Sequence, residues 1–246
     1  MSETAATPKA YQTTARELVA EALVLILAAA SIYFFARKTY LMSAVMLGII
    51  IFRFVFCYRK GDLIFFFLGF VLGGGNDLIS MYKKVYAYLP APDISLLPIP
   101  MWVLLFWGLI FVFFRKLMRF GPFLGEPPKR LIDQPLLLDG LILVIYRMII
   151  YRTADRFWLP DALFAAILVL RLLVSVPSKN ERRLMLTMLV LGPAYEIWLI
   201  HCGLYVYQTG FFYGMPLWLI VYWVFVIRLL KAIFDRIETR VVMRAR

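Results

Sequence analysis

The feature that most constrains the fold is a succession of long apolar segments with little chain between them. An α-helix needs about 20 apolar residues to cross the roughly 30 Å hydrocarbon core of a bilayer. Eight segments approach that length, and the fifth and sixth are short: Leu18 to Ala36, Leu41 to Tyr58, Leu63 to Tyr82, Pro98 to Phe114, Leu136 to Tyr151, Asp161 to Val176, Leu184 to Tyr207 and Met215 to Phe234. Hydrophobic residues make up 63% of the 246 residues, more than one soluble core can bury. The sequence therefore predicts an all-α polytopic membrane protein of about eight transmembrane helices, without a soluble domain.

The positions of Lys and Arg predict the orientation of these helices. Basic residues are more frequent on one side of the membrane, which would hold both termini: Lys9, Arg16, Arg59, Lys60, Arg115, Lys116, Arg119, Lys129, Arg130, Lys179, Arg182, Arg183 and the residues from Arg228 to Arg246. The other side carries only Arg37, Lys38, Lys83, Lys84, Arg152 and Arg156. By the positive-inside rule, we expect cytoplasmic N- and C-termini in a bacterial inner membrane. The net charge of +12 is then spread over short loops, which suits anionic lipid headgroups better than nucleic acid.

Several common kinds of site are not expected. Cys57 and Cys202 are predicted near opposite ends of their helices, too far apart for a disulfide. The single histidine, His201, has no second histidine or cysteine at ligand spacing, so no metal site is predicted. The sequence also lacks a phosphate-binding loop and a Ser-His-Asp pattern. We therefore expect no cofactor and no soluble-type catalysis.

An internal repeat of four helices organises the chain. Ala20 to Arg53 aligns with Leu138 to Arg171 at an offset of 118 (171 minus 53). The alignment continues at an offset of 119, pairing Gly73 with Gly192, Asp77 with Glu196, Tyr86 with Tyr205 and Tyr88 with Tyr207, and then at 116, pairing Trp107 with Trp223. The predicted units are a cytoplasmic segment 1–17, repeats 18–117 and 136–235, a linker 118–135 and a basic tail 236–246. Because each repeat has an even number of helices, an axis along the membrane normal should relate the two.

Two matching stretches are the candidate site. Leu72-Gly73-Gly74-Gly75-Asn76-Asp77 and Leu191-Gly192-Pro193-Ala194-Tyr195-Glu196 each place helix-weakening residues before an acid within the outer half of the membrane. We predict that both helices are interrupted there. Asp77 and Glu196 are the candidate catalytic residues, with Asn76 and Tyr195 as binding residues beside them. The alternative is that each acid only caps a broken backbone or bonds a neighbouring helix.

Arg147 and His201 are candidate partners of these acids. Arg147 stands where the first repeat has Ala29, at a level that predicts an ion pair with Glu196 or Asp77; the alternative is that it extends toward the interface. His201 follows Glu196 by five residues, which suggests a proton relay, although a packing role is the alternative.

Tyrosines and tryptophans gather where the outer interface is expected. Tyr86, Tyr88, Tyr205, Tyr207, Trp102 and Trp218 either form an interfacial aromatic belt or cover the acidic site and contact a lipidic ligand.

The last quarter of the chain resembles carotenoid-hydratase-type integral membrane proteins. The residues that carry the resemblance are Glu196, Tyr205-x-Tyr207, Gly214-Met215-Pro216-Leu217-Trp218 and Trp223. It implies that a protonated carboxylic acid within the membrane donates its proton to an isoprenoid double bond, to which water then adds.

Three kinds of function remain open. The first is an enzyme or binding protein for a lipid or isoprenoid, and an apolar cleft open sideways to lipid would support it. The second is an ion- or proton-coupled transporter or channel, for which a polar vestibule should lead from water to the acids. The third is a structural subunit of a membrane complex. The expected partners are membrane lipids and a hydrophobic small molecule.

Overall fold

The computed structural model describes residues 11–89, 98–125, 128 and 130–242, and eight α-helices dominate them. They are α1 (Ala15–Phe35), α2 (Thr39–Phe56), α3 (Asp62–Tyr82), α4 (Met101–Met118), α5 (Gln134–Thr153), α6 (Leu159–Val174), α7 (Lys179–His201) and α8 (Leu217–Ile237). Seven of the helices in the described chain are long and apolar enough to cross a membrane; the 16-residue α6 is shorter. The predicted all-α polytopic fold is therefore confirmed. Predictions at 1–10, 126–127, 129 and 243–246, including Lys9 and Lys129, lie outside the described residues.

Polar residues at the helix starts set where several helices begin. Thr14 caps α1 and Ser178 caps α7, and each forms a reciprocal capping box with the Glu three residues later. Asp133 caps α5 by accepting a hydrogen bond from the backbone N–H of Leu136. These caps satisfy N–H groups that no earlier turn can bond.

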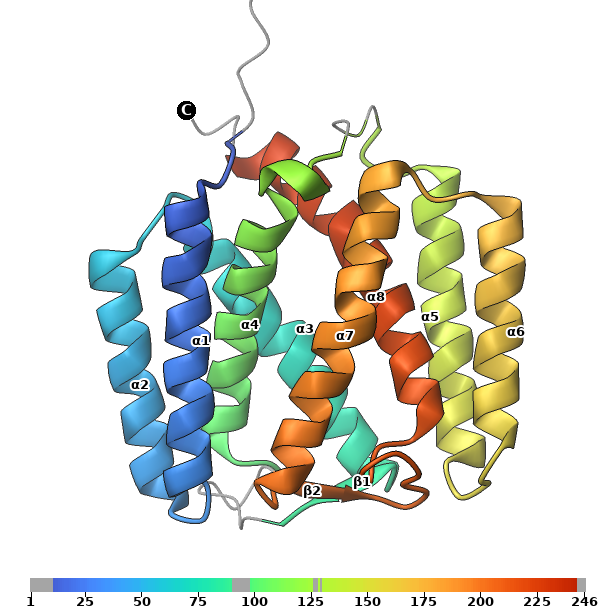
Figure 1. The fold of residues 1–246 in the computed structure, drawn as a ribbon, viewed down its shortest axis with the longest axis horizontal. Coiled ribbons are helices and arrows are strands. Elements are labelled where there is room, and N and C mark those ends of the chain that lie inside the picture. The colour runs from blue at the N-terminus through green and yellow to red at the C-terminus, as the bar shows by residue number, and fades with distance from the viewer. Residues whose placement is uncertain (1–10, 90–97, 126–127, 129, 243–246) are drawn as a thin grey trace, which may run out of the picture.

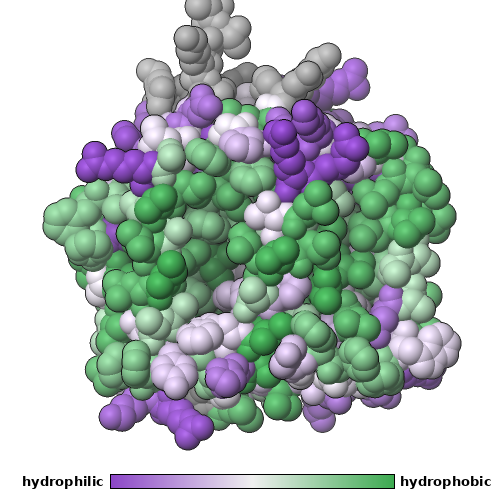
Figure 2. All heavy atoms as spheres, in the orientation of Figure 1, coloured by the Kyte–Doolittle hydropathy of each residue, from purple (hydrophilic) through white to green (hydrophobic). Residues whose placement is uncertain are grey.

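Figure 1 shows α1–α4 and α5–α8 as two groups of helices, with the start of α1 and the end of α8 at the same end of the molecule. We call this the terminal end. The long helices run between it and the opposite end, where two short strands lie. In the same orientation, Figure 2 shows a broad hydrophobic band across the molecule with hydrophilic side chains above and below it. That distribution fits a protein whose middle layer faces hydrocarbon.

The glycine-rich stretches of α3 and α7 do not interrupt these helices. Both helices are continuous, and Pro193 lies inside α7. A Cβ atom built on Gly73 would come within 2.4 Å of the Trp107 ring, and one built on Gly192 within 2.7 Å of the Trp223 ring. The glycines therefore let α3 approach α4 and α7 approach α8, which is a common use of small residues between membrane helices. The prediction of two broken helices is wrong.

A two-stranded ribbon joins the halves. Strand β1 (Tyr86–Tyr88) follows α3, strand β2 (Tyr205–Tyr207) follows α7, and the two pair antiparallel with Ala87 opposite Val206. An antiparallel pair has a local two-fold axis, which here passes through that central pair. We call this end of the molecule the ribbon end. The seventh segment was predicted to stay helical to Tyr207, but α7 ends at His201 and the chain turns at Gly203, where φ is +68°.

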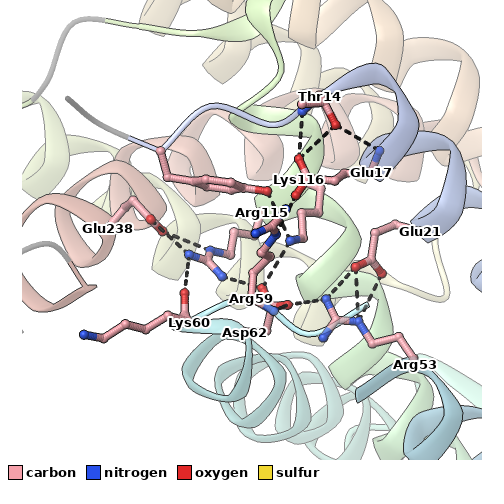
Figure 3. A network of polar contacts seen from close by, with 11 residues as sticks. Thr14, Glu17, Glu21, Arg53, Arg59, Lys60, Asp62, Arg115, Lys116 and Glu238 are labelled. Atoms are coloured by element: carbon pink, nitrogen blue, oxygen red, sulfur yellow. Dashed lines mark hydrogen bonds and ion pairs between the residues drawn. The ribbon is translucent and has the colours of Figure 1, made fainter. Parts of the chain in front are cut away.

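A network of buried ion pairs lies toward the terminal end (Figure 3). Arg53 pairs with Glu21 and Asp62, and Arg115 pairs with Asp62 and Glu238. Glu238 follows α8, so this network ties the end of the second half to the first. The second half has a smaller equivalent, in which the Arg171 Nε donates to Asp139. Buried charges need such partners, because an unpaired one costs several kcal/mol.

Candidate functional site

The Asp77 carboxylate, on the last turns of α3, accepts three hydrogen bonds. The Tyr86 hydroxyl donates to Oδ1 at 2.7 Å, the Tyr88 hydroxyl to Oδ2 at 2.9 Å and the Trp107 indole N–H to Oδ2 at 2.8 Å. The Asp77 side chain is almost completely buried, with 6% of the residue exposed. Its polar contacts therefore come from protein groups that are fixed by α4 and the ribbon.

The Glu196 carboxylate has the same three kinds of donor in the second half. The Tyr205 and Tyr207 hydroxyls donate to Oε2, the latter at 3.3 Å, and the Trp223 indole N–H donates to Oε1 at 3.0 Å. Glu196 is also 6% exposed.

The ribbon positions the four tyrosines because side chains alternate along a strand. Tyr86, Tyr88, Tyr205 and Tyr207, which we call the ribbon tyrosines, turn toward the acids, whereas Ala87 and Val206 are exposed. Burial raises the pKa of each ribbon tyrosine well above the usual 10.0. The ribbon tyrosines therefore stay neutral and keep their O–H protons.

The donor pattern fixes where each acid can carry a proton. An indole N–H only donates, so Trp107 holds Oδ2 of Asp77 and Trp223 holds Oε1 of Glu196 as acceptors. The other oxygen of each acid meets tyrosine hydroxyls alone, and a hydroxyl can accept as well as donate. A proton on Asp77 Oδ1 or Glu196 Oε2 therefore needs only the rotation of one hydroxyl. The site can hold either a carboxylate or a carboxylic acid.

Both acids line one crevice, with a volume of about 220 Å³. It follows α8 from Trp218 to Ile233, which is about 22 Å at 1.5 Å per residue. The ribbon end of the crevice is polar, and its further lining is apolar, with side chains that include Leu143, Val226, Leu229, Leu230 and Ile233. Leu72 on α3 also lines the crevice and is 46% exposed.

Arg147 lines this crevice but pairs with neither acid. Its guanidinium donates to the hydroxyls of Ser80, at 3.3 Å, and Tyr222, and it lies over the Tyr222 ring at 4.7 Å. In the described part of the chain Arg147 makes no ion pair with either acid, so the predicted pairing is wrong. Tyrosine and tryptophan donors occupy the positions around the carboxylates that it was expected to fill.

The remaining predicted residues divide between the crevice and other places. Asn76 and Trp218 line the crevice, and the Trp218 ring packs against Tyr207. Trp102, 1% exposed, is buried in the first turn of α4 and is not part of the crevice lining. Tyr195 lines a separate apolar groove.

The proposed proton relay through His201 is wrong. The His201 side chain is exposed in the last turn of α7 and is not part of the crevice lining. Five residues correspond to about 500° of helical rotation, which turns His201 about 140° away from Glu196.

Trp107, Trp223, Tyr222 and Ser80 belong to the site but were not among the predicted site residues. The two indoles stack, with ring centres 6.2 Å apart and an interplanar angle of 20°. The repeat itself held the signal for Trp107 and Trp223, because each lies at the same position of its half as the other. No comparable signal marked Tyr222, whose repeat partner is Phe106.

A second groove lies between α1, α4, α7 and α8 and has a volume of about 320 Å³. Its lining is apolar, and Trp223 is shared with the acid crevice. No cluster of three or more His, Cys, Asp or Glu side chains that could hold a metal ion occurs within the described ranges.

Comparison with known proteins adds little to this geometry. A family model described as a protein of unknown function (DUF2878) matches residues 146–245, which include Glu196 and its donors. No curated protein and no solved structure gives a significant match to the chain.

Proposed function

We propose that this membrane protein binds a lipid or isoprenoid in the acid crevice and acts on it. The observation that carries the proposal is the change in lining along the crevice, from acids and tyrosines at the ribbon end to aliphatic side chains along α8. Ligand sites are mostly apolar with a few polar groups that set orientation. A long hydrocarbon chain with one polar or reactive end suits this gradient.

The chemistry we propose is acid-catalysed hydration or a related reaction. Glu196 in its protonated form donates the proton on Oε2 to a carbon–carbon double bond, whose π electrons form the new C–H bond and leave a carbocation. Water adds to the cation and gives up a proton, which returns to the carboxylate. The Asp77 carboxylate positions that water, and the stacked Trp107 and Trp223 rings stabilise the cation through their π faces.

We propose the cytoplasm as the location of the terminal end, in a bacterial inner membrane. The excess of Lys and Arg in the loops on that side supports this orientation. The acids would then lie in the outer half of the bilayer.

A proton- or ion-coupled transporter is the second candidate, because two acids and Arg147 line one crevice at membrane depth. Transport needs a wet path to the acids, and the lining toward the terminal end is aliphatic. We therefore favour the lipid or isoprenoid. A structural subunit of a larger complex would not require a crevice that both acids line.

Lipid analysis tests the favoured function. Extracts of cells that express the wild type should contain a hydrated isoprenoid or altered lipid that Glu196→Gln abolishes, while Asp155→Asn, an exposed acid outside the site, keeps it. Identical profiles for wild type and Glu196→Gln would exclude the enzyme. Proton flux in reconstituted vesicles that Asp77→Asn abolishes would favour the transporter instead.

A further inference from the structure

The apolar groove is the internal counterpart of the acid crevice. The repeat offsets of 118, 119 and 116 relate ten of the fifteen groove-lining residues to residues that line the acid crevice, and seven of these pairs are apolar on both sides. In the order acid crevice and groove, the pairs are Leu143 and Leu25, Leu72 and Leu191, Gly73 and Gly192, Trp107 and Trp223, Val226 and Ile110, Leu229 and Phe113, and Leu230 and Phe114. One chain therefore carries two versions of the same crevice, and each serves as a comparison for the other.

The two versions differ where the acid crevice is polar. Arg147 corresponds to Ala29 in the groove, and Tyr222 corresponds to Phe106. Asn76 corresponds to Tyr195. The acid crevice thus has a cation, an amide and a tyrosine hydroxyl at positions where its counterpart has an alanine, a tyrosine and a phenylalanine. These differences lie in one region near the ribbon end, at the polar end of the crevice.

The charge of Arg147 is the part of this set that needs an explanation. A cation within a membrane span is costly unless an anion or water balances it. The guanidinium contacts two neutral hydroxyls, on Ser80 and Tyr222. Among the described residues it forms no ion pair, and the Asp77 carboxylate acts on it only at longer range. Its planar fork can bind both oxygens of an oxyanion at once.

We propose that the ligand of the acid crevice carries an oxyanion, a carboxylate or a phosphate, that pairs with Arg147 while its hydrocarbon chain lies along α8. This assignment rests on the proposed function. Asn76 and Tyr222 supply further hydrogen-bond donors to the same head, and the counterpart groove recognises no such head. An oxyanion next to Arg147 also adds negative charge to a crevice that already holds the Asp77 carboxylate, which disfavours ionisation of Glu196 and so favours its protonated form, the one needed for proton transfer.

Binding of three probes tests the oxyanion. The probes are dibromostearate, dibromostearyl phosphate and dibromostearyl alcohol, whose bromines quench tryptophans that line the crevice; the protein is held in phosphatidylcholine nanodiscs. The wild type should reach half-saturation with one anionic probe at about a tenfold lower concentration than with the alcohol, as expected for a charged hydrogen-bonded pair. The preferred anion identifies the head as a carboxylate or a phosphate.

Variants link that preference to Arg147. Arg147→Ala, which installs the residue of the counterpart groove, should bring anion and alcohol to similar affinities, and Arg147→Lys should keep most of the preference. Arg152→Ala on the same helix is the control, because Arg152 is exposed. Equal binding of all three probes to wild type, or an unchanged preference in a folded Arg147→Ala, would overturn the oxyanion but leave chain binding intact. If no probe gives saturable quenching, the proposed function itself fails.

Discussion

Replacing Tyr86 by Phe tests whether the Asp77 carboxylate depends on the ribbon. Within the part of the chain that the structure describes, Tyr86 is the only hydrogen-bond donor to Oδ1 of Asp77, at 2.7 Å. Phe keeps the ring and removes only the hydroxyl, so the change leaves one oxygen of a buried acid without a donor.

The expected cost follows from the charge of the acid. A hydrogen bond to an ionised group contributes about 1.5–3 kcal/mol and one between neutral groups about 0.5–1.5 kcal/mol. Tyr86→Phe should therefore lower the free energy of unfolding by about 2 kcal/mol if Asp77 is ionised. Tyr88→Phe should cost about 1 kcal/mol, because Trp107 still donates to the same oxygen.

The assay is reversible unfolding in mixed micelles, followed by circular dichroism as the fraction of denaturing detergent rises. Tyr40→Phe is the matched control, since Tyr40 is 75% exposed and should change stability by less than about 0.5 kcal/mol. A double-mutant cycle with Asp77→Asn isolates the Tyr86–Asp77 interaction. If Tyr86→Phe costs no more than Tyr40→Phe, or if the cycle gives no coupling, the proposed role of the hydroxyl is wrong.

Two further predictions concern packing and pH. Gly73→Ala should destabilise the protein by about 1–3 kcal/mol, because the added Cβ would meet the Trp107 ring. Gly75→Ala is the control: its Cβ would have no neighbouring atom within 4 Å, so it should be neutral or stabilising. Equal effects of the two changes in the same unfolding assay would refute the close approach of α3 and α4. The free energy of unfolding should fall above pH 10. Tyrosines in the unfolded chain ionise near 10.0, whereas the raised pKa of each ribbon tyrosine keeps its proton in the folded state. The fall should reach up to about 1.4 kcal/mol per pH unit for each tyrosine. Tyr207→Phe should make that fall less steep, and an unchanged slope would contradict the assignment.

The sequence was sufficient to predict the fold class because membrane helices need length and apolarity more than any particular neighbour. Their observed ends differ from the predicted ones mostly by a few residues; β2 is the exception, since its Tyr-Val-Tyr pattern continues the apolar run of α7. A three-residue strand gives too short an alternation to be distinguished from a helix end. Its partner β1 is also remote in the chain, so only the fold reveals the pairing.

The helix interruptions were predicted wrongly for a physical reason. The absence of a Cβ atom gives glycine two opposite effects: it weakens a helix in water, and it permits close packing between helices. In hydrocarbon no water competes for the backbone groups, so Gly73 and Gly192 stay helical and the packing use prevails. For Arg147 and His201, spacing indicated a depth in the membrane, but contact also depends on the direction around the helix axis. That direction could not be predicted from the sequence.

The repeat distinguishes the parts of the site that both halves share, the acid clusters, from the part that only one crevice has, Arg147. Both halves keep an acid that accepts hydrogen bonds from two tyrosines and one tryptophan, at the place where the ribbon meets the helices. Only the crevice along α8 adds Arg147, where its counterpart has Ala29. Both acids also line that crevice, and neither lines its counterpart. Because the cation lies in one crevice, we expect one anionic ligand per chain, and the acids of both halves serve that single molecule.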